Sequence, residues 1–173
     1  MYNARLKAYK KIGYELCTSI DGEKQKANAI YDMDTYSETY WRDIAEANDS
    51  IVISSPSLNN AKVNRIIAEL AFRQEVGLRI TIVTWHPDSY KYGRDDVRMS
   101  LMERLRNAGF EIKLVEDSCE RYAVIDKEIV WYGSMNLLSK EDVEDNLMRV
   151  CSKDIAAKLL EMTFGKEKEI ENW

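Results

Sequence analysis

Short apolar runs alternate along the chain with longer segments in which apolar residues recur at helical spacing. A run of about five apolar residues is typical of a strand that is covered on both faces. Strands that alternate with longer helices favour an α/β sandwich, with a mostly parallel sheet and helices on both faces. The sequence predicts strands over 51–55, 79–84, 111–116 and 145–150, and helices over 36–48, 61–75, 96–108 and 153–164.

Each predicted helix carries an apolar stripe that we expect to face the sheet, because residues three and four apart share one side of a helix. In chain order, the stripes are Trp41, Ile44 and Ala45; Val63, Ile66, Ile67, Leu70 and Ala71; Val97, Leu101 and Leu105; and Ile155, Leu159 and Met162.

Residues 119–136, CERYAVIDKEIVWYGSMN, predict an antiparallel hairpin. Strands over 122–125 and 129–132 flank a charged turn at Lys127-Glu128, and a second turn follows at Gly133-Ser134. Alternating β-branched and aromatic residues around a charged turn favour this arrangement.

The first 28 residues differ from the rest of the chain. Leu6, Tyr9, Ile12 and Leu16 have helical spacing over residues 3–17, and a polar linker follows. We therefore expect an amphipathic arm and linker over 1–28 and a single domain over 29–173. The arm could cover the domain's own core or join it to another domain or subunit, and periodicity does not decide between these.

Composition limits the function classes. The longest apolar runs fall short of the ~20 residues of a membrane span, and the basic start lacks the apolar stretch of a secretory signal. Three widely spaced cysteines and a single histidine argue against a zinc site and favour a reducing cytoplasm. The most basic third, residues 61–113, has ten basic and seven acidic side chains, for a charge of +3. A dedicated nucleic-acid binder would carry a denser basic stripe.

Within residues 119–136, Asp126 is followed by six residues and then by Gly133-Ser134-Met135-Asn136. This spacing resembles the phospholipase D superfamily motif, which runs His-x-Lys, four residues, Asp, six residues, Gly-Ser-x-Asn. The segment IYDMDTYSETYWRDIAEANDSIVISSPSL is similar to that family's lead-in to its first core strand. In element order the resemblance covers residues 29–164.

The motif departs from the family at its chemical centre. The family's nucleophilic histidine falls on Cys119 and its lysine falls on Arg121. Asp126 keeps its motif position, and Asp145 is the nearest match to the acidic residue that orients the histidine. The family attacks phosphorus with one histidine and protonates the leaving group with a second, and it uses no metal or cofactor. With one motif per chain, the resemblance implies a homodimer.

A thiol replaces a histidine poorly in this chemistry, because its nucleophilic form is the thiolate and it cannot also serve as the general acid. Arginine still suits phosphate oxygens, since its guanidinium carries a permanent charge and a fork of donors. We expect a catalytically degenerate domain that dimerises or binds a phosphate-bearing ligand, a nucleotide or, weakly, a nucleic acid through Arg121, Ser134 and Asn136. The alternative is an active metal-independent phosphodiesterase or nuclease that uses Cys119.

Other polar and aromatic residues receive structural interpretations. His86 precedes a proline in a loop, and Ser54, Ser55 and Ser57 follow a strand without a visible base, so we expect loop and turn roles. We expect the four tryptophans to serve the core and interfaces, because no two lie in an exposed basic run. These are Trp41, Trp85, Trp131 and Trp173.

Overall fold

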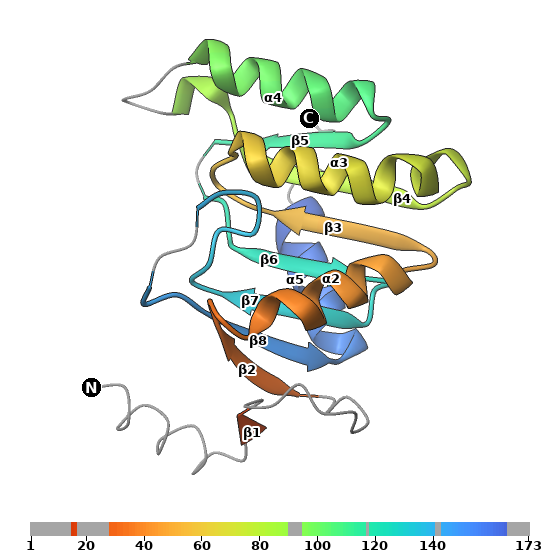
Figure 1. The fold of residues 1–173 in the computed structure, drawn as a ribbon, viewed down its shortest axis with the longest axis vertical. Coiled ribbons are helices and arrows are strands. Elements are labelled where there is room, and N and C mark those ends of the chain that lie inside the picture. Colours follow the sequence, from red (N-terminus) through yellow and green to blue (C-terminus); the bar gives the residue numbers. More distant parts are fainter. Residues whose placement is uncertain (1–14, 17–27, 90–94, 117, 141–142, 166–173) are drawn as a thin grey trace, which may run out of the picture.

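The computed structural model of the protein describes residues 15–16, 28–89, 95–116, 118–140 and 143–165. These residues form one eight-stranded sheet in the order β1-β2-β8-β7-β6-β3-β4-β5 (Figure 1). Its strands are β1 (Glu15–Leu16), β2 (Ala29–Asp32), β3 (Ser50–Ser54), β4 (Arg79–Trp85), β5 (Glu111–Val115), β6 (Tyr122–Ile125), β7 (Ile129–Gly133) and β8 (Asn146–Cys151).

The sheet is mixed. Strands β3, β4 and β5 run parallel, as do β1 and β2, whereas β2, β8, β7, β6 and β3 pair antiparallel in turn. The predicted α/β class and the β6–β7 hairpin are confirmed. The antiparallel part of the sheet is larger than this hairpin. The predicted last strand, β8, pairs with β7, and β2 pairs with the other side of β8. The sequence analysis missed β2, since four residues are too few to show a period.

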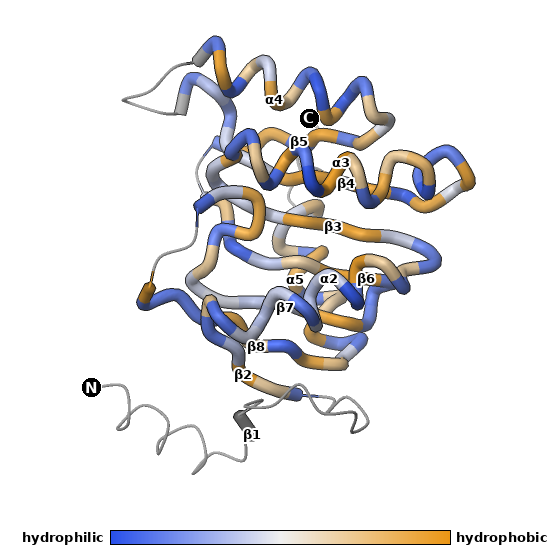
Figure 2. The backbone as a smooth tube through the Cα atoms, viewed as in Figure 1, coloured by the Kyte–Doolittle hydropathy of each residue, from blue (hydrophilic) through white to orange (hydrophobic). Residues whose placement is uncertain are grey.

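Four helices cover the sheet in the part of the chain that the structure describes. Three lie on one face and α5 lies on the other (Figure 1). Along α3 and α4, apolar and polar residues alternate at helical spacing (Figure 2), because one side of each helix is buried. The helices are α2 (Tyr36–Glu46), α3 (Asn60–Glu75), α4 (Asp95–Asn107) and α5 (Lys153–Phe164), with a short 3-10 turn, η1, over Pro87–Ser89.

The two faces differ in the size of their cores. Helices α2, α3 and α4 bury one large cluster against the sheet, with Ile53, Ile66 and Trp131 wholly inside it. Helix α5 buries a smaller cluster through Ala156 and Leu159. The large cluster therefore contributes most of the apolar burial in the described part of the domain.

The predicted stripes of α4 and α5 need correction. In α4, Leu101 and Leu105 are buried as expected, but Val97 is 44 % exposed. In α5, Ile155 and Met162 are 43 % and 51 % exposed, whereas Leu159 is buried together with Ala156. The inward face of α5 is centred on small Ala156, which the apolar pattern did not single out. Of the other predicted residues, Trp41, Ile44, Val63, Ile66 and Leu70 are buried, Ile67 and Ala71 are half-buried, and Ala45 is exposed.

The predicted N-terminal helix over 3–17 is wrong at Glu15 and Leu16, the two residues of this range that the structure describes. Glu15 and Leu16 form β1, which pairs in parallel with Ala29 and Ile30. Without β1, the outer side of β2 would be an open sheet edge with unpaired backbone groups. Glu15 and Leu16 satisfy these groups as a strand, which they could not do in a helix. Residues 1–14 and 17–27 of the predicted arm lie outside the described residues, and the boundary at residue 29 stays a prediction.

A buried ion pair lies beneath α2 and was not expected from the sequence. Asp43, on the inward side of α2, accepts hydrogen bonds from Arg149 at 2.7 and 3.0 Å and from the indole N–H of Trp131 at 2.8 Å. Asp43 is 2 % exposed and Arg149 is 3 % exposed. Because each charge is paired and hydrogen-bonded, the pair fixes α2 over β7 and β8 without leaving an isolated buried charge.

Candidate functional site

The motif residues Cys119 and Arg121 lie at the edge of the sheet where β3 and β4 end. Ser54, the last residue of β3, pairs with Tyr122, the first residue of β6. The Cys119 Sγ atom lies 3.4 Å from the Ser54 hydroxyl and 3.8 Å from the Val83 carbonyl oxygen. Ligands of open α/β sheets gather at the carboxyl ends of parallel strands. We call this edge, with its loops, the motif edge.

The surroundings of Cys119 favour the neutral thiol. Burial raises the pKa of the Cys119 thiol above its ordinary value, and the nearby Glu120 carboxylate adds to the rise. The hydrogen bond to Ser54 and the charge of Arg121 act in the opposite direction without cancelling the rise. A thiol with a raised pKa holds little of the nucleophilic thiolate near neutral pH.

Arg121 directly precedes β6 and is exposed. Its main-chain carbonyl accepts a hydrogen bond from the Gly133 N–H at 3.3 Å, which places Gly133 beside it. No Cβ could be added at Gly133, since it would lie 2.1 Å from the Asn146 carbonyl oxygen. Glycine therefore allows β8 to approach at this point, and the close packing brings together the segments before β6, after β7 and before β8.

Ser134 and Asn136 lie in the loop after β7, also at the motif edge. The Ser134 hydroxyl accepts the Asn146 N–H at 3.1 Å, and the Ser134 N–H donates to the Asn146 carbonyl at 3.1 Å. Ser134 is exposed, and its hydroxyl proton can still be donated to a ligand. The Asn136 side-chain oxygen is buried and has no hydrogen-bond partner among the described residues. A buried polar atom without a partner is uncommon in proteins, so this oxygen has unused capacity to accept a hydrogen bond at the motif edge.

The serines after β3 hold two loops of the motif edge together. The Ser55 hydroxyl donates to the Ser57 carbonyl at 2.9 Å and accepts the Leu138 N–H at 3.3 Å. The Asn59 N–H donates to the Leu138 carbonyl at 2.8 Å. Ser55 and Ser57 therefore have the expected turn role. Ser54 differs, because its hydroxyl contacts Cys119 and donates to the Glu120 carbonyl at 2.5 Å.

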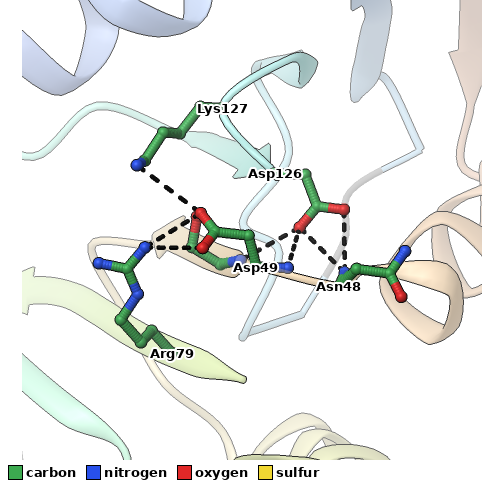
Figure 3. A network of polar contacts seen from close by, with 6 residues as sticks. Asn48, Asp49, Arg79, Asp126 and Lys127 are labelled. Carbon is green, nitrogen blue, oxygen red and sulfur yellow. Dashed lines mark hydrogen bonds and ion pairs between the residues drawn. The ribbon is translucent and has the colours of Figure 1, made fainter. Parts of the chain in front are cut away.

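Asp126 does not belong to this edge, although the sequence grouped it with Cys119 and Arg121. It follows the last residue of β6, at the opposite end of that strand. Its carboxylate accepts N–H groups of Asn48, Asp49 and Ser50 at 2.8–3.1 Å (Figure 3). The φ angles of Asp126 and Lys127 are 51° and 57°, and positive φ at both central residues is the mark of a type I′ hairpin turn. The Glu128 N–H closes this turn on the Ile125 carbonyl at 3.1 Å, so the turn is centred one residue earlier than the predicted Lys127-Glu128. Asp126 thus anchors the hairpin to the start of β3.

The family model described as "Cardiolipin synthase, PLD-like domain" matches residues 40–166. The chain belongs to the phospholipase D-like family. No curated protein matches the chain.

Solved structures show the same fold. Nuc from Salmonella typhimurium, a phospholipase D family member, is 17 % identical with a TM-score of 0.58, over 78 % of this chain and 90 % of that one. NucT from Helicobacter pylori is 18 % identical with a TM-score of 0.59, over 83 % and 95 %. TrmBL2, an archaeal chromatin protein with a novel mode of DNA binding, is 10 % identical with a TM-score of 0.58; the match covers 97 % of this chain and 61 % of that one.

The other expected residues of the phospholipase D-like domain fall at defined places. Asp145 is half-buried and directly precedes β8, so it lies at the motif edge as the family pattern implies. His86 follows β4, and its Nδ1 atom accepts the Asp88 N–H at 3.3 Å. The imidazole therefore serves its own loop, as expected. Trp41 and Trp131 are core residues, whereas Trp173 lies outside the described residues.

In the described ranges, no group of three or more His, Cys, Asp or Glu side chains could hold a metal ion. No helix in those ranges is long and apolar enough to cross a membrane.

Proposed function

We propose that this phospholipase D-like domain is catalytically inactive and binds a phosphate-bearing ligand at the motif edge. The observation that carries the proposal is the state of Cys119, which occupies the position of the family's nucleophilic histidine. Its thiol is partly buried, contacts the Ser54 hydroxyl and has a raised pKa. It is a neutral structural group rather than an activated nucleophile.

Phosphodiester cleavage asks two things of the motif histidine. The histidine of one motif copy must supply a nucleophilic nitrogen at neutral pH. The histidine of the other copy must supply a proton to the leaving group. The Cys119 thiol serves both purposes poorly, because its small thiolate fraction limits attack and because a thiol with a raised pKa is a weaker acid than the imidazolium of a histidine. Losing a nucleophile costs on the order of a million-fold in turnover in serine proteases, which leaves most of the barrier to phosphodiester cleavage standing.

Binding survives the loss of catalysis. Arg121 offers an exposed guanidinium, Ser134 a hydroxyl proton, and Asn136 a side-chain amide whose NH2 group is a hydrogen-bond donor. A guanidinium fork suits phosphate oxygens. Affinity for duplex DNA is weak at physiological salt, because few phosphates can be neutralised by a chain of net charge −5.

The domain works as a homodimer within a nucleic-acid-related system. Support comes from the family's need for two motif copies and from the similarity to TrmBL2, an archaeal chromatin protein that binds DNA. The domain is cytoplasmic, a placement supported by Cys119 and Cys151, which are free thiols in the structure.

Calorimetric titration with inorganic phosphate and with a nucleotide tests the binding site. Arg121→Ala should weaken binding more than Arg121→Lys, because lysine keeps the charge and loses only the fork. Arg106→Ala is the matched control, since Arg106 is an exposed arginine on α4. Equal affinity of the wild type and Arg121→Ala would place the ligand elsewhere.

A further inference from the structure

A cleft of about 450 Å³ opens at the edge of the sheet opposite the motif edge, on the face that α5 covers. The starts of β3 and β4, the turn after β6 and the last turn of α5 border it. Its volume falls in the range of about 300–1,000 Å³ that small-molecule sites occupy. Neither the family motif nor the proposed phosphate site uses any residue of this cleft.

The floor and one wall of the cleft are apolar. Val52 and Val124 contribute from neighbouring strands, and Leu160 and Phe164 contribute from α5. The Lys113 ammonium lies 4.9 Å from the centre of the Phe164 ring, a cation–π contact that holds the ring beside β5. An apolar body can therefore exchange water contact for contact with these side chains.

The rim of the cleft at the turn after β6 is formed by two cations, Arg79 and Lys127. The Asp49 and Asp126 carboxylates beside them do not line the cleft. Arg79 donates to Asp49 at 2.8 and 3.0 Å, and Lys127 lies 3.6 Å from the same carboxylate (Figure 3). Two cations thus share one carboxylate. The neighbouring Asp126 carboxylate points toward backbone N–H groups of Asn48 to Ser50 and accepts their hydrogen bonds. The Arg79 and Lys127 side chains are 65 % and 61 % exposed, so both can turn toward a ligand.

The β5 side of the cleft has the opposite charge. Glu111 lies there and accepts a hydrogen bond from the Thr81 hydroxyl at 3.3 Å. An anionic group would be repelled on this side and attracted at the Arg79–Lys127 side. The rim therefore imposes one orientation on a charged ligand.

We propose that this cleft binds a small amphipathic anion, with its apolar body against Val52, Leu160 and Phe164 and its charged group at Arg79 and Lys127. The site is separate from the motif edge, and the two can be tested independently.

Two dyes with the same apolar body test both halves of the proposal on the full chain. Anilinonaphthalene sulfonate carries an anionic group, and phenylnaphthylamine is its neutral counterpart. The sulfonate should bind saturably and roughly tenfold more tightly than the neutral dye, because a group placed at two cations gains about one charge-assisted contact. The double variant Arg79→Gln, Lys127→Gln should remove this preference and leave the neutral dye unaffected. The control Arg106→Gln, on the face of α4, should change neither affinity.

The location of the dye is tested by filling the cleft. Thr81→Trp places a large side chain in it and should abolish binding of both dyes. If this variant does not fold, amide hydrogen exchange of the wild-type protein tests the location of the dye instead. Bound sulfonate should slow exchange in the peptides over 79–85 and 158–164. The proposal is overturned by the absence of saturable binding, by unchanged binding to folded Thr81→Trp, by unchanged exchange in both peptides, or by a sulfonate preference that survives the double variant.

Discussion

Replacing Asp126 should destabilise the domain without affecting the proposed phosphate site at the motif edge. The carboxylate accepts hydrogen bonds from three consecutive backbone N–H groups at 2.8–3.1 Å. Hydrogen bonds to a charged acceptor contribute about 1.5–3 kcal/mol each when buried. The bonds from Asn48 and Asp49 are exposed, so water replaces part of their contribution. We therefore expect Asp126→Gly to lower the free energy of unfolding by about 2–3 kcal/mol in total.

The geometry of the turn separates this contribution from backbone strain. Asp126 has φ of 51°, which glycine adopts freely and which costs an ordinary residue about 1–2 kcal/mol. Asp126→Ala should therefore lose about 1 kcal/mol more than Asp126→Gly. Asp126→Asn should lose the least, about 1 kcal/mol, because asparagine tolerates positive φ and keeps one acceptor oxygen.

Urea unfolding followed by circular dichroism measures the series. Asp49→Asn is the matched control, since the side chain of Asp49 makes only exposed contacts. These are ion pairs with Arg79 and Lys127, which contribute about 0–1 kcal/mol, and a hydrogen bond accepted from the Ser50 hydroxyl at 3.1 Å. Phosphate affinity should be the same for the wild type and Asp126→Asn. A loss below about 0.5 kcal/mol in Asp126→Gly would refute the anchoring role, and a loss of phosphate affinity in Asp126→Asn would return Asp126 to the ligand site.

Two further predictions concern the thiol and the assembly. Iodoacetamide at pH 7.5 should modify exposed Cys151 well before Cys119, because the raised pKa keeps the Cys119 thiol protonated. The rate of Cys119 modification should climb as the pH rises and the thiolate forms. Peptide mapping that finds Cys119 modified before Cys151 would contradict this. Sedimentation at micromolar concentration should give a dimer, and a monomer in the intact protein would remove the proposed assembly.

Much of the fold could be predicted from the sequence, because buried strands and amphipathic helices leave strong periodic patterns. The β3, β4 and β5 strands and the β6–β7 hairpin follow from such runs. Strand β2 could not be found in this way, and the face of α5 was misjudged because small Ala156 is buried while Met162 is exposed. Hydrophobicity ranks methionine above alanine, but the space between a helix and a sheet selects for size as well.

The site was predictable only in part, for a similar reason. Motif spacing identified Cys119, Arg121, Ser134 and Asn136, which the structure places at one edge. It also included Asp126, because positions in a linear motif carry no information about which end of a strand they occupy. The buried partners of Cys119, including the Ser54 hydroxyl, come from a distant part of the chain and have no local sequence signal.

The central claim, that Cys119 leaves the domain without catalysis, is tested most directly by hydrolysis of bis(p-nitrophenyl) phosphate. The wild type should show no turnover, with or without a divalent metal. The double variant Cys119→His, Arg121→Lys should show metal-independent turnover, because it restores the family's nucleophile beside Ser54. Wild-type turnover that disappears in Cys119→Ser and after thiol alkylation would contradict the claim and establish a cysteine-dependent phosphodiesterase.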